Sequence, residues 1–178
     1  METPPLVVRA LALAESLGFE KSCRPEDGAL LHVLAARRGI IRAAEIGTGS
    51  GVGAAWIVSA LPPQTPFFTA ELDPDLAARA GELLAADPSV TVLSGPWRTT
   101  LPPEAPFDLL FVDARDARVD IEATIGVLAP GGTAVLDDFW FDPDLSDPVR
   151  DAWLHHPLLS TIELWVTRER RALVSVRR

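Results

Sequence analysis

The chain has 178 residues, 48% of them hydrophobic, which is enough for one domain with a sizeable core and too apolar for global disorder. The formal net charge of −9 argues against a nucleic-acid-binding surface, because neutralising phosphates needs clustered Lys and Arg. Cys23 is the single cysteine, which fits a reducing compartment, and the sequence shows neither a signal-peptide pattern nor an 18-residue apolar run. The expected location is therefore cytoplasmic, with no membrane partner.

Helices and strands alternate through the first half of the chain. The ranges expected from apolar spacing and stop residues are, in order, helices 5–17 and 25–38, strand 42–46, helix 50–61, strand 67–72 and helix 74–86. Asp73 is the expected N-cap of the last of these helices, with Pro74 at its first position.

The second half continues the alternation and ends in an antiparallel pair. The expected ranges are strands 90–93 and 107–112, helix 116–128 stopped at 130–132, strand 133–136, helix 147–155 and strands 161–167 and 172–176. Alternating strands and helices predict a parallel sheet covered on both faces. In such sheets ligands bind beyond the carboxyl ends of the strands, so the residues directly after each strand are the candidates for a site.

A glycine loop follows the first predicted strand in AEIGTGSGVGAAW, residues 44–56, with Gly47, Gly49, Gly51 and Gly53 at every second position. A strand, a glycine turn and a helix N-terminus form a ligand cradle, because backbone N–H groups can approach whatever binds there. The segment 49–54 also matches the G-x-G-x-x-A pattern of dinucleotide-binding proteins, so the loop alone leaves the ligand open.

Two carboxylates flank the loop and bear on which ligand it holds. Glu45 ends the first strand and is expected to face the ligand cavity, where its charge would repel a pyrophosphate and attract an ammonium or sulfonium group. At ~5 Å and an effective dielectric constant of ~20, one such contact changes the energy by roughly 3 kcal/mol in either direction. Glu71 ends the second strand, in place to accept hydrogen bonds from two ribose hydroxyls. The alternative is that both are surface carboxylates.

Four segments resemble the class I S-adenosylmethionine (SAM)-dependent methyltransferases, and within them the catechol O-methyltransferase-like family of small O-methyltransferases. In chain order they are CRPEDGALLHVLAARRGIIRAAEIGTGSGVGAAWI, FFTAELDPDLAARA, FDLLFVDARDARV and LAPGGTAVLDDFW. The resemblance implies a single domain over 1–178, with N-terminal helices at 1–39 and a doubly wound, Rossmann-like α/β core at 40–178. Its seven strands are expected in the order 3-2-1-4-5-7-6, with an antiparallel last strand.

The same resemblance implies SAM as the cofactor. The expected cofactor contacts lie in the glycine loop and at the strand ends: Glu45, Gly47, Thr48, Gly49, Ser50, Gly51, Glu71, Leu72, Gly95, Trp97 and Asp113. Three aromatic residues that follow strand ends would flank the adenine or an aromatic acceptor, or else pack on the sheet edge: Trp97, Phe139 and Trp140. The remaining tryptophans are expected in the core: Trp56, Trp153 and Trp165.

Asp113, Asp137 and Asp138 occupy the positions at which family members bind a divalent cation such as Mg²⁺, although the family has Asn in place of Asp138. Such an ion binds carboxylate and carbonyl oxygens, and it can chelate two adjacent oxygens of a diol and lower the pKa of a hydroxyl. The alternative is that Asp137 and Asp138 cap the following loop and Asp113 caps the next helix, because Asp is common at strand–helix junctions.

Asp116 stands where the family has its catalytic lysine, so Asp113 and Asp116 are the catalytic candidates that the resemblance supplies. Arg115 stays protonated and cannot act as a base, Lys21 is far upstream, and the chain has no tyrosine. The remaining candidates for a general base are carboxylates and three histidines, His32, His155 and His156. On this basis Asp116→Lys is expected to raise the rate of methyl transfer at neutral pH.

The function expected from the resemblance is SAM-dependent methyl transfer to a hydroxyl of a small molecule, with a catechol-like aromatic and metal assistance as candidates. A SAM-binding protein with lost catalysis is the alternative that the replacement at Asp116 motivates, and a nucleotide-dependent oxidoreductase is disfavoured by Glu45. Nucleic-acid methylation fits poorly, because the fourth strand ends in Asp113-Ala114 and lacks the Asn/Asp-Pro-Pro-aromatic motif that holds a flipped base. The expected partner is a small-molecule acceptor, and a homodimer is a candidate assembly.

Overall fold

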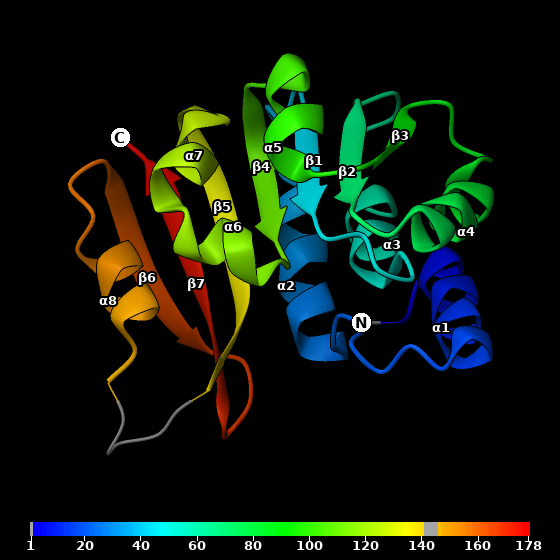
Figure 1. Cartoon of the computed structure of the whole chain (residues 1–178), viewed down its shortest axis with the longest axis horizontal. Helices are drawn as coiled ribbons and strands as arrows, with labels where there is room; N and C mark the ends of the chain where they lie inside the picture. Colours follow the sequence, from blue (N-terminus) through cyan, green and yellow to red (C-terminus); the bar gives the residue numbers. More distant parts are fainter. Residues whose placement is uncertain (1, 141–145) are drawn as a thin grey trace.

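The computed structural model describes residues 2–140 and 146–178, except for the side chains of Asp138 and Trp140. Its strands form one seven-stranded sheet in the order β3-β2-β1-β4-β5-β7-β6, which confirms the expected order (Figure 1). The strands are β1 (Ala43–Ile46), β2 (Phe67–Glu71), β3 (Val90–Ser94), β4 (Phe107–Val112), β5 (Leu128–Trp140), β6 (Leu159–Trp165) and β7 (Arg170–Arg177). β7 pairs antiparallel with both β5 and β6, and the other pairings are parallel.

Helices cover both faces of the sheet. The first group is α1 (Pro5–Leu17), α2 (Pro25–Ala35), α3 (Val52–Val58) and α4 (Pro74–Leu84), and its buried side chains share one core with β1, β2 and β4. The second group is α5 (Trp97–Thr100), α6 (Arg115–Val119), α7 (Ile121–Gly126) and α8 (Pro148–Leu154), which pack on the opposite core. A short 3₁₀ helix, η1 (Pro102–Glu104), follows α5. The N-terminal helices thus pack into the same core as the sheet.

The position of β1 determines where a ligand can bind. β1 lies between β2 and β4, with Ile46 level with Ala70 on one side and Val112 on the other. From β1 the chain continues to β2 and β3 on one side, and it later continues from β4 to β5 on the other side. The connections that follow β1 and β4 therefore run in opposite directions away from the centre of the sheet. A crevice at such a switch point is the usual ligand site of an open α/β sheet.

The helix expected at 116–128 is wrong in detail, because two helices and the start of a strand occupy that range. Asp120 leaves the helical conformation with φ −90° and ψ 70°, and its carboxylate caps α7 by accepting the Ala123 N–H. β5 then begins at Leu128, paired with Phe107, so the strand starts before the Pro-Gly-Gly segment that was expected to precede it. The four-residue helix α5 was not expected at all.

Two of the three tryptophans expected in the core are buried, and the third is exposed. Trp56 and Trp153 are buried as expected, whereas Trp165 is 55% exposed and stacks against Arg171, whose guanidinium carbon lies 4.2 Å from its ring centroid. Trp165 ends the edge strand β6, which has a neighbour on one side only. Among the described residues, no helix is long and apolar enough to cross a bilayer.

Candidate functional site

A cavity of about 1120 Å³ opens at the carboxyl ends of the central strands. The expected cofactor contacts that line it are Gly47, Thr48, Gly49, Ser50, Glu71, Leu72, Gly95, Trp97 and Asp113. Glu45 and Gly51 are not among its described lining residues. The strand ends therefore bring most of the predicted residues to one site, as the sheet order requires.

The glycine loop depends on conformations that side chains rarely adopt. Gly47, Gly49 and Gly51 have φ values of 95°, 53° and 85°. A Cβ at Gly47 would lie 2.5 Å from the Asp113 carbonyl oxygen, so the loop passes against the end of β4 without room for a side chain. This close approach joins the ends of β1 and β4 at the floor of the cavity.

The loop also holds Glu71 in place. The Gly49 N–H donates to Glu71 Oε2 at 2.7 Å, and the Asp73 N–H donates to Oε1 at 3.0 Å. Asp73 in turn caps α4, as predicted, by accepting the N–H groups of Asp75 and Leu76. Two backbone donors therefore orient the Glu71 carboxylate on the cavity wall at the end of β2.

Glu45 does not face the cavity as expected. Its side chain lies beneath the loop, 1% exposed, where it accepts hydrogen bonds from Thr69 Oγ1 at 2.6 Å and from the Ala54 backbone. Burial raises its pKa from 4.5 to about 8, and the nearby charge of Glu71 adds to this effect. Without a bound ligand, the group is therefore largely protonated at neutral pH, and the charge argument from sequence loses most of its force.

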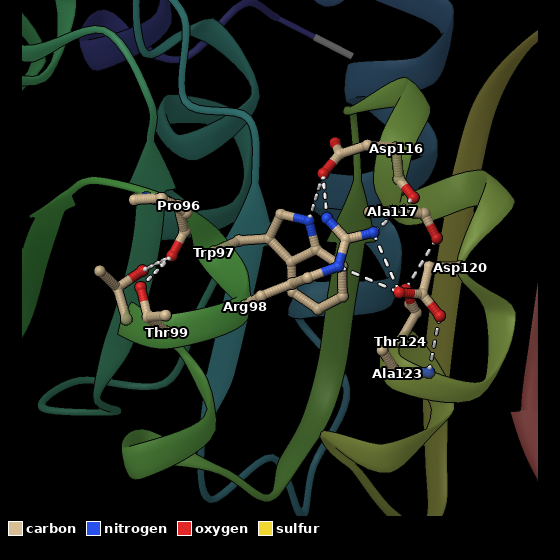
Figure 2. Close-up of polar contacts among 10 residues, drawn as sticks. Pro96, Trp97, Arg98, Thr99, Asp116, Ala117, Asp120, Ala123 and Thr124 are labelled. Atoms are coloured by element: carbon tan, nitrogen blue, oxygen red, sulfur yellow. Dashed lines mark hydrogen bonds and ion pairs between the residues drawn. The ribbon is translucent and has the colours of Figure 1, made fainter.

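Trp97 and Asp116 connect the two helices that flank the cavity beyond β3 and β4 (Figure 2). The Trp97 indole Nε1–H donates to Asp116 Oδ2 at 2.9 Å, and Arg98 Nη1 donates to the same oxygen at 2.7 Å. Arg98 also donates to Asp120, so its guanidinium joins α5 to both α6 and the start of α7. The Asp116 carboxylate is therefore engaged by two donors, and its catalytic role stays a prediction.

A guanidinium lies between the carboxylates of Asp113 and Asp137. Arg118 Nη2 donates to Oδ1 of both residues at 3.3 Å. The N-cap of α6 is Ala114 and not Asp113, so the capping alternative for Asp113 is not supported. Among the described residues, no group of three His, Cys, Asp or Glu side chains could hold a metal, and the Asp138 side chain lies outside the description. The guanidinium of Arg118 thus occupies the position between two of the three predicted ligands, and the divalent ion stays a prediction.

The segment between α1 and α2 forms a wall of the cavity that the sequence analysis missed. Phe19, Lys21 and Cys23 line it, although Lys21 had been set aside as far upstream. Burial and the charges of Asp137 and Asp113 raise the pKa of the Cys23 thiol well above its ordinary value, so a thiolate nucleophile is disfavoured there. Gly18 ends α1 in the αL conformation, and the connecting segment that begins there carries these lining residues.

The three histidines lie elsewhere. His32 Nδ1 is 3.1 Å from the Trp56 carbonyl oxygen, and His155 and His156 line a second hollow beside β6. None of the three is among the described residues that line the main cavity. A histidine general base at this site is therefore not supported.

Comparison with known proteins identifies the chain. A family model described as a methyltransferase domain matches residues 44–139, which span the glycine loop, Glu71, Asp113 and Asp137. The chain belongs to this methyltransferase-domain family.

The methyltransferase domain is 42% identical over 94 residues to the protein-L-isoaspartate O-methyltransferase of Ignicoccus hospitalis, covering 52% of this chain and 44% of that protein. It is 33% identical over 138 residues to a Mycobacterium avium protein provisionally named an O-methyltransferase, covering 72% of this chain and 62% of that protein. It thus spans less than two thirds of either relative.

Solved structures share the whole fold of the methyltransferase domain. TomG of Streptomyces achromogenes, an O-methyltransferase involved in tomaymycin synthesis and crystallised in complex with SAM, is 25% identical with a TM-score of 0.79, covering 99% of this chain and 91% of that one. A Bacillus cereus O-methyltransferase in complex with SAH, the product that SAM leaves after methyl transfer, is 19% identical with a TM-score of 0.82. The match covers 100% of this chain and 93% of that one. At that lower identity the likeness concerns the fold alone.

Proposed function

We propose that this chain is a SAM-dependent methyltransferase that acts on an oxygen of a small molecule. The observation that carries the proposal is the Glu71 carboxylate, oriented by the Gly49 and Asp73 N–H groups on the wall of the strand-end cavity in a methyltransferase-domain family member. A carboxylate at this place can accept hydrogen bonds from two ribose hydroxyls. The complex of TomG with SAM supports the same cofactor for this chain.

The structure also favours SAM over a dinucleotide, for a reason different from the one inferred from sequence. Dinucleotide-binding folds place a pyrophosphate on the N–H groups at the start of the helix after the glycine loop. Here the Ala54 N–H, in the first turn of α3, already donates to Glu45. The carboxyl group of Glu45 thus takes up a donor that a pyrophosphate would need.

Positioning is the main contribution that these residues can make to methyl transfer. SAM supplies an electrophilic methyl group on a sulfonium, and displacement by an acceptor oxygen is fast only when the two are aligned. Glu71 would hold the ribose, and Trp97, fixed by Asp116, would pack against the adenine. Asp113, Asp137 and Arg118 lie toward β4 and β5, where an acceptor would meet the methyl group.

A second candidate is a SAM-binding protein without catalysis. It is favoured by the engagement of Asp116 with Trp97 and Arg98 at the position of the family's lysine. The location of all three histidines away from the cavity points in the same direction. A small acceptor instead of a nucleic acid accords with the net charge of −9, while a homodimer and a cytoplasmic location stay predictions.

Calorimetry with SAM, SAH and NAD tests the cofactor. We expect SAM and SAH to bind and NAD not to, and Glu71→Ala to weaken SAM binding by about 1–3 kcal/mol through loss of hydrogen bonds to a charged acceptor. Glu82→Ala is the matched control, because Glu82 is an exposed carboxylate on α4 whose partner is Arg79. Binding of NAD without binding of SAM would refute the proposal. Methyl transfer to a panel of hydroxylated acceptors then separates the enzyme from the binding protein.

A further inference from the structure

We infer that the guanidinium of Arg118 is the resident cation of the acceptor end of this cavity, in place of the divalent ion that the family resemblance implies. The inference rests on the proposed methyl transfer and deepens it, because it defines the class of acceptor that the site would take: an acidic phenol whose single ionised oxygen binds Arg118.

In this arrangement a guanidinium nitrogen occupies the position between the two aspartates. One nitrogen, Arg118 Nη2, is within 3.3 Å of Asp113 Oδ1 and of Asp137 Oδ1. A divalent cation binds carboxylate oxygens at roughly 2.0–2.6 Å, so it would have to take the place of that nitrogen. The displaced guanidinium would then lie beside the ion, and two cations at close range repel each other.

The backbone of Arg118 is also held by a hydrogen bond from α8. Its carbonyl oxygen accepts the Trp153 indole N–H at 2.8 Å, and Trp153 is fully buried between α8 and the sheet. The backbone of α6 at Arg118 is therefore anchored to α8, while the side chain extends back to Asp113 after β4 and to Asp137 within β5. The hydrogen bond to Trp153 fixes the backbone of Arg118, and the two ion pairs with Asp113 and Asp137 hold its guanidinium.

The chemistry of a guanidinium sets the class of acceptor. Arg118 lines the cavity with the 15% of its side chain that stays exposed, and it cannot accept a proton. Its charge is shared with the carboxylates of Asp113 and Asp137, and its remaining N–H groups can donate to an anionic oxygen that approaches it. Because no chelation is involved, one oxygen suffices and a vicinal diol is not required. The buried ring of Phe139, on the same cavity wall after Asp137, favours an aromatic acceptor.

The reaction balances without a protein base. The phenol loses its proton to solvent, and the resulting oxyanion, bound to Arg118, attacks the methyl carbon of SAM. The new C–O bond forms as the C–S bond breaks, and the electron pair stays on sulfur to give the neutral thioether SAH. Arg118 keeps its protons throughout, so its contribution is to hold the oxyanion and stabilise its charge.

Melting temperatures with divalent ions test the place of Arg118 in the site. We compare the wild type with Arg118→Gln, Arg118→Lys and the control Arg79→Gln, in which an exposed arginine on α4 is neutralised. Millimolar Mg²⁺, Mn²⁺ or Ca²⁺ is expected to raise the melting temperature of Arg118→Gln alone, because ion binding to the native state stabilises it. A rise in the wild type that Asp137→Ala removes, or no rise in Arg118→Gln, overturns the inference. The wild-type and Arg118→Lys results remain decisive if Arg118→Gln does not fold.

Binding of 4-nitrophenolate to the protein in the presence of SAH tests the acceptor class. The absorption band of the phenolate reports its contact with a cation, so affinity is measured without turnover. We expect the affinity to fall at least about tenfold in Arg118→Gln, less in Arg118→Lys, and not at all in Arg79→Gln, as loss of a charge-assisted hydrogen bond predicts. Equal affinity in wild type and Arg118→Gln, or no binding by the wild type, overturns the acceptor class. Calorimetry with SAH alone reports separately on the proposed function.

Discussion

The indole N–H of Trp97 donates to the carboxylate of Asp116 at 2.9 Å, so the residue at the position of the family's lysine holds an aromatic side chain of the cavity. Arg98 supplies a second hydrogen bond to the same oxygen, at 2.7 Å (Figure 2). The arrangement fixes the side of the cavity beyond β3, where the adenine is proposed to bind. Asp116 would thus act on the cofactor through Trp97, as a positioning residue.

Asp116→Ala is expected to weaken SAM binding by about 1 kcal/mol, or roughly fivefold in Kd, because Trp97 loses the acceptor that orients it. Arg98→Ala is the companion variant, and its effect is expected to be smaller, since exposed ion pairs contribute only about 0–1 kcal/mol. Calorimetry with SAM measures both. Unchanged affinity in Asp116→Ala would show that Trp97 needs no such support.

Asp116→Lys reverses an expectation drawn from sequence. The family's lysine suggested that this change would restore a base and raise the rate, but a lysine here would meet the Arg98 guanidinium and could not accept the Trp97 N–H. We now expect SAM binding weaker than in Asp116→Ala and no gain in rate at neutral pH. A faster variant with wild-type SAM affinity would show instead that the lysine can turn into the cavity.

How far the sequence predicts the structure depends on whether a feature is local or set by packing. The strand at 107–112 and the helix at 5–17 have the predicted bounds, because an apolar run and a proline–glycine pair mark their ends within the sequence. The strand order followed from four motifs in the family's order. The break at Asp120 could not be found in this way, because a side-chain cap competes there with a helix that apolar spacing alone would continue.

The place of most expected site residues follows from the strand ends, whereas the orientation of Glu45 and the position of Arg118 do not. Glu71 and Asp113 line the cavity, since Glu71 is the last residue of β2 and Asp113 directly follows β4. Glu45 lies below the loop, because successive side chains of a strand alternate between its faces, and Glu45 shares with Ala43 the face that α3 covers. Arg118 was overlooked because only the folded α6 brings its side chain back to the strand ends.

Gly53 and Gly81 form a matched pair for testing the packing beneath the loop. A Cβ at Gly53 would lie 2.3 Å from Glu45 Oε1 and 2.9 Å from the Phe111 ring, whereas a Cβ at Gly81 in α4 would have nothing within 4 Å. Gly53→Ala is expected to destabilise the protein by about 1–3 kcal/mol through overpacking. Gly81→Ala is expected to stabilise it by roughly 0.5–1 kcal/mol, because alanine favours a helix interior. Urea unfolding measures the free energy of unfolding of both variants and of the wild type. A stability unchanged by Gly53→Ala would contradict the described packing of Glu45.

The buried carboxyl of Glu45 makes stability depend on pH. Its pKa is about 8 in the folded chain and 4.5 when ordinarily solvated, so between these values the native state holds a proton that the unfolded state has released. Unfolding then releases a proton, and the free energy of unfolding falls as pH rises, by up to about 1.4 kcal/mol per pH unit from this group. The contribution of Glu45 is fully present below pH 4.5 and lost as pH rises through about 8.

Glu45→Gln isolates this effect, because the amide keeps the shape of the side chain and cannot ionise. Relative to the wild type, the variant is expected to gain stability progressively as pH rises from about 4.5 to about 8, with little further gain above that range. Glu82→Gln is the control, because it removes the charge of an exposed carboxylate on α4. Urea unfolding across this pH range measures the difference between variant and wild type. A difference that stays constant with pH would mean that Glu45 is ionised in the native state, and the charge that the sequence analysis assigned to it beside the cofactor would then be restored.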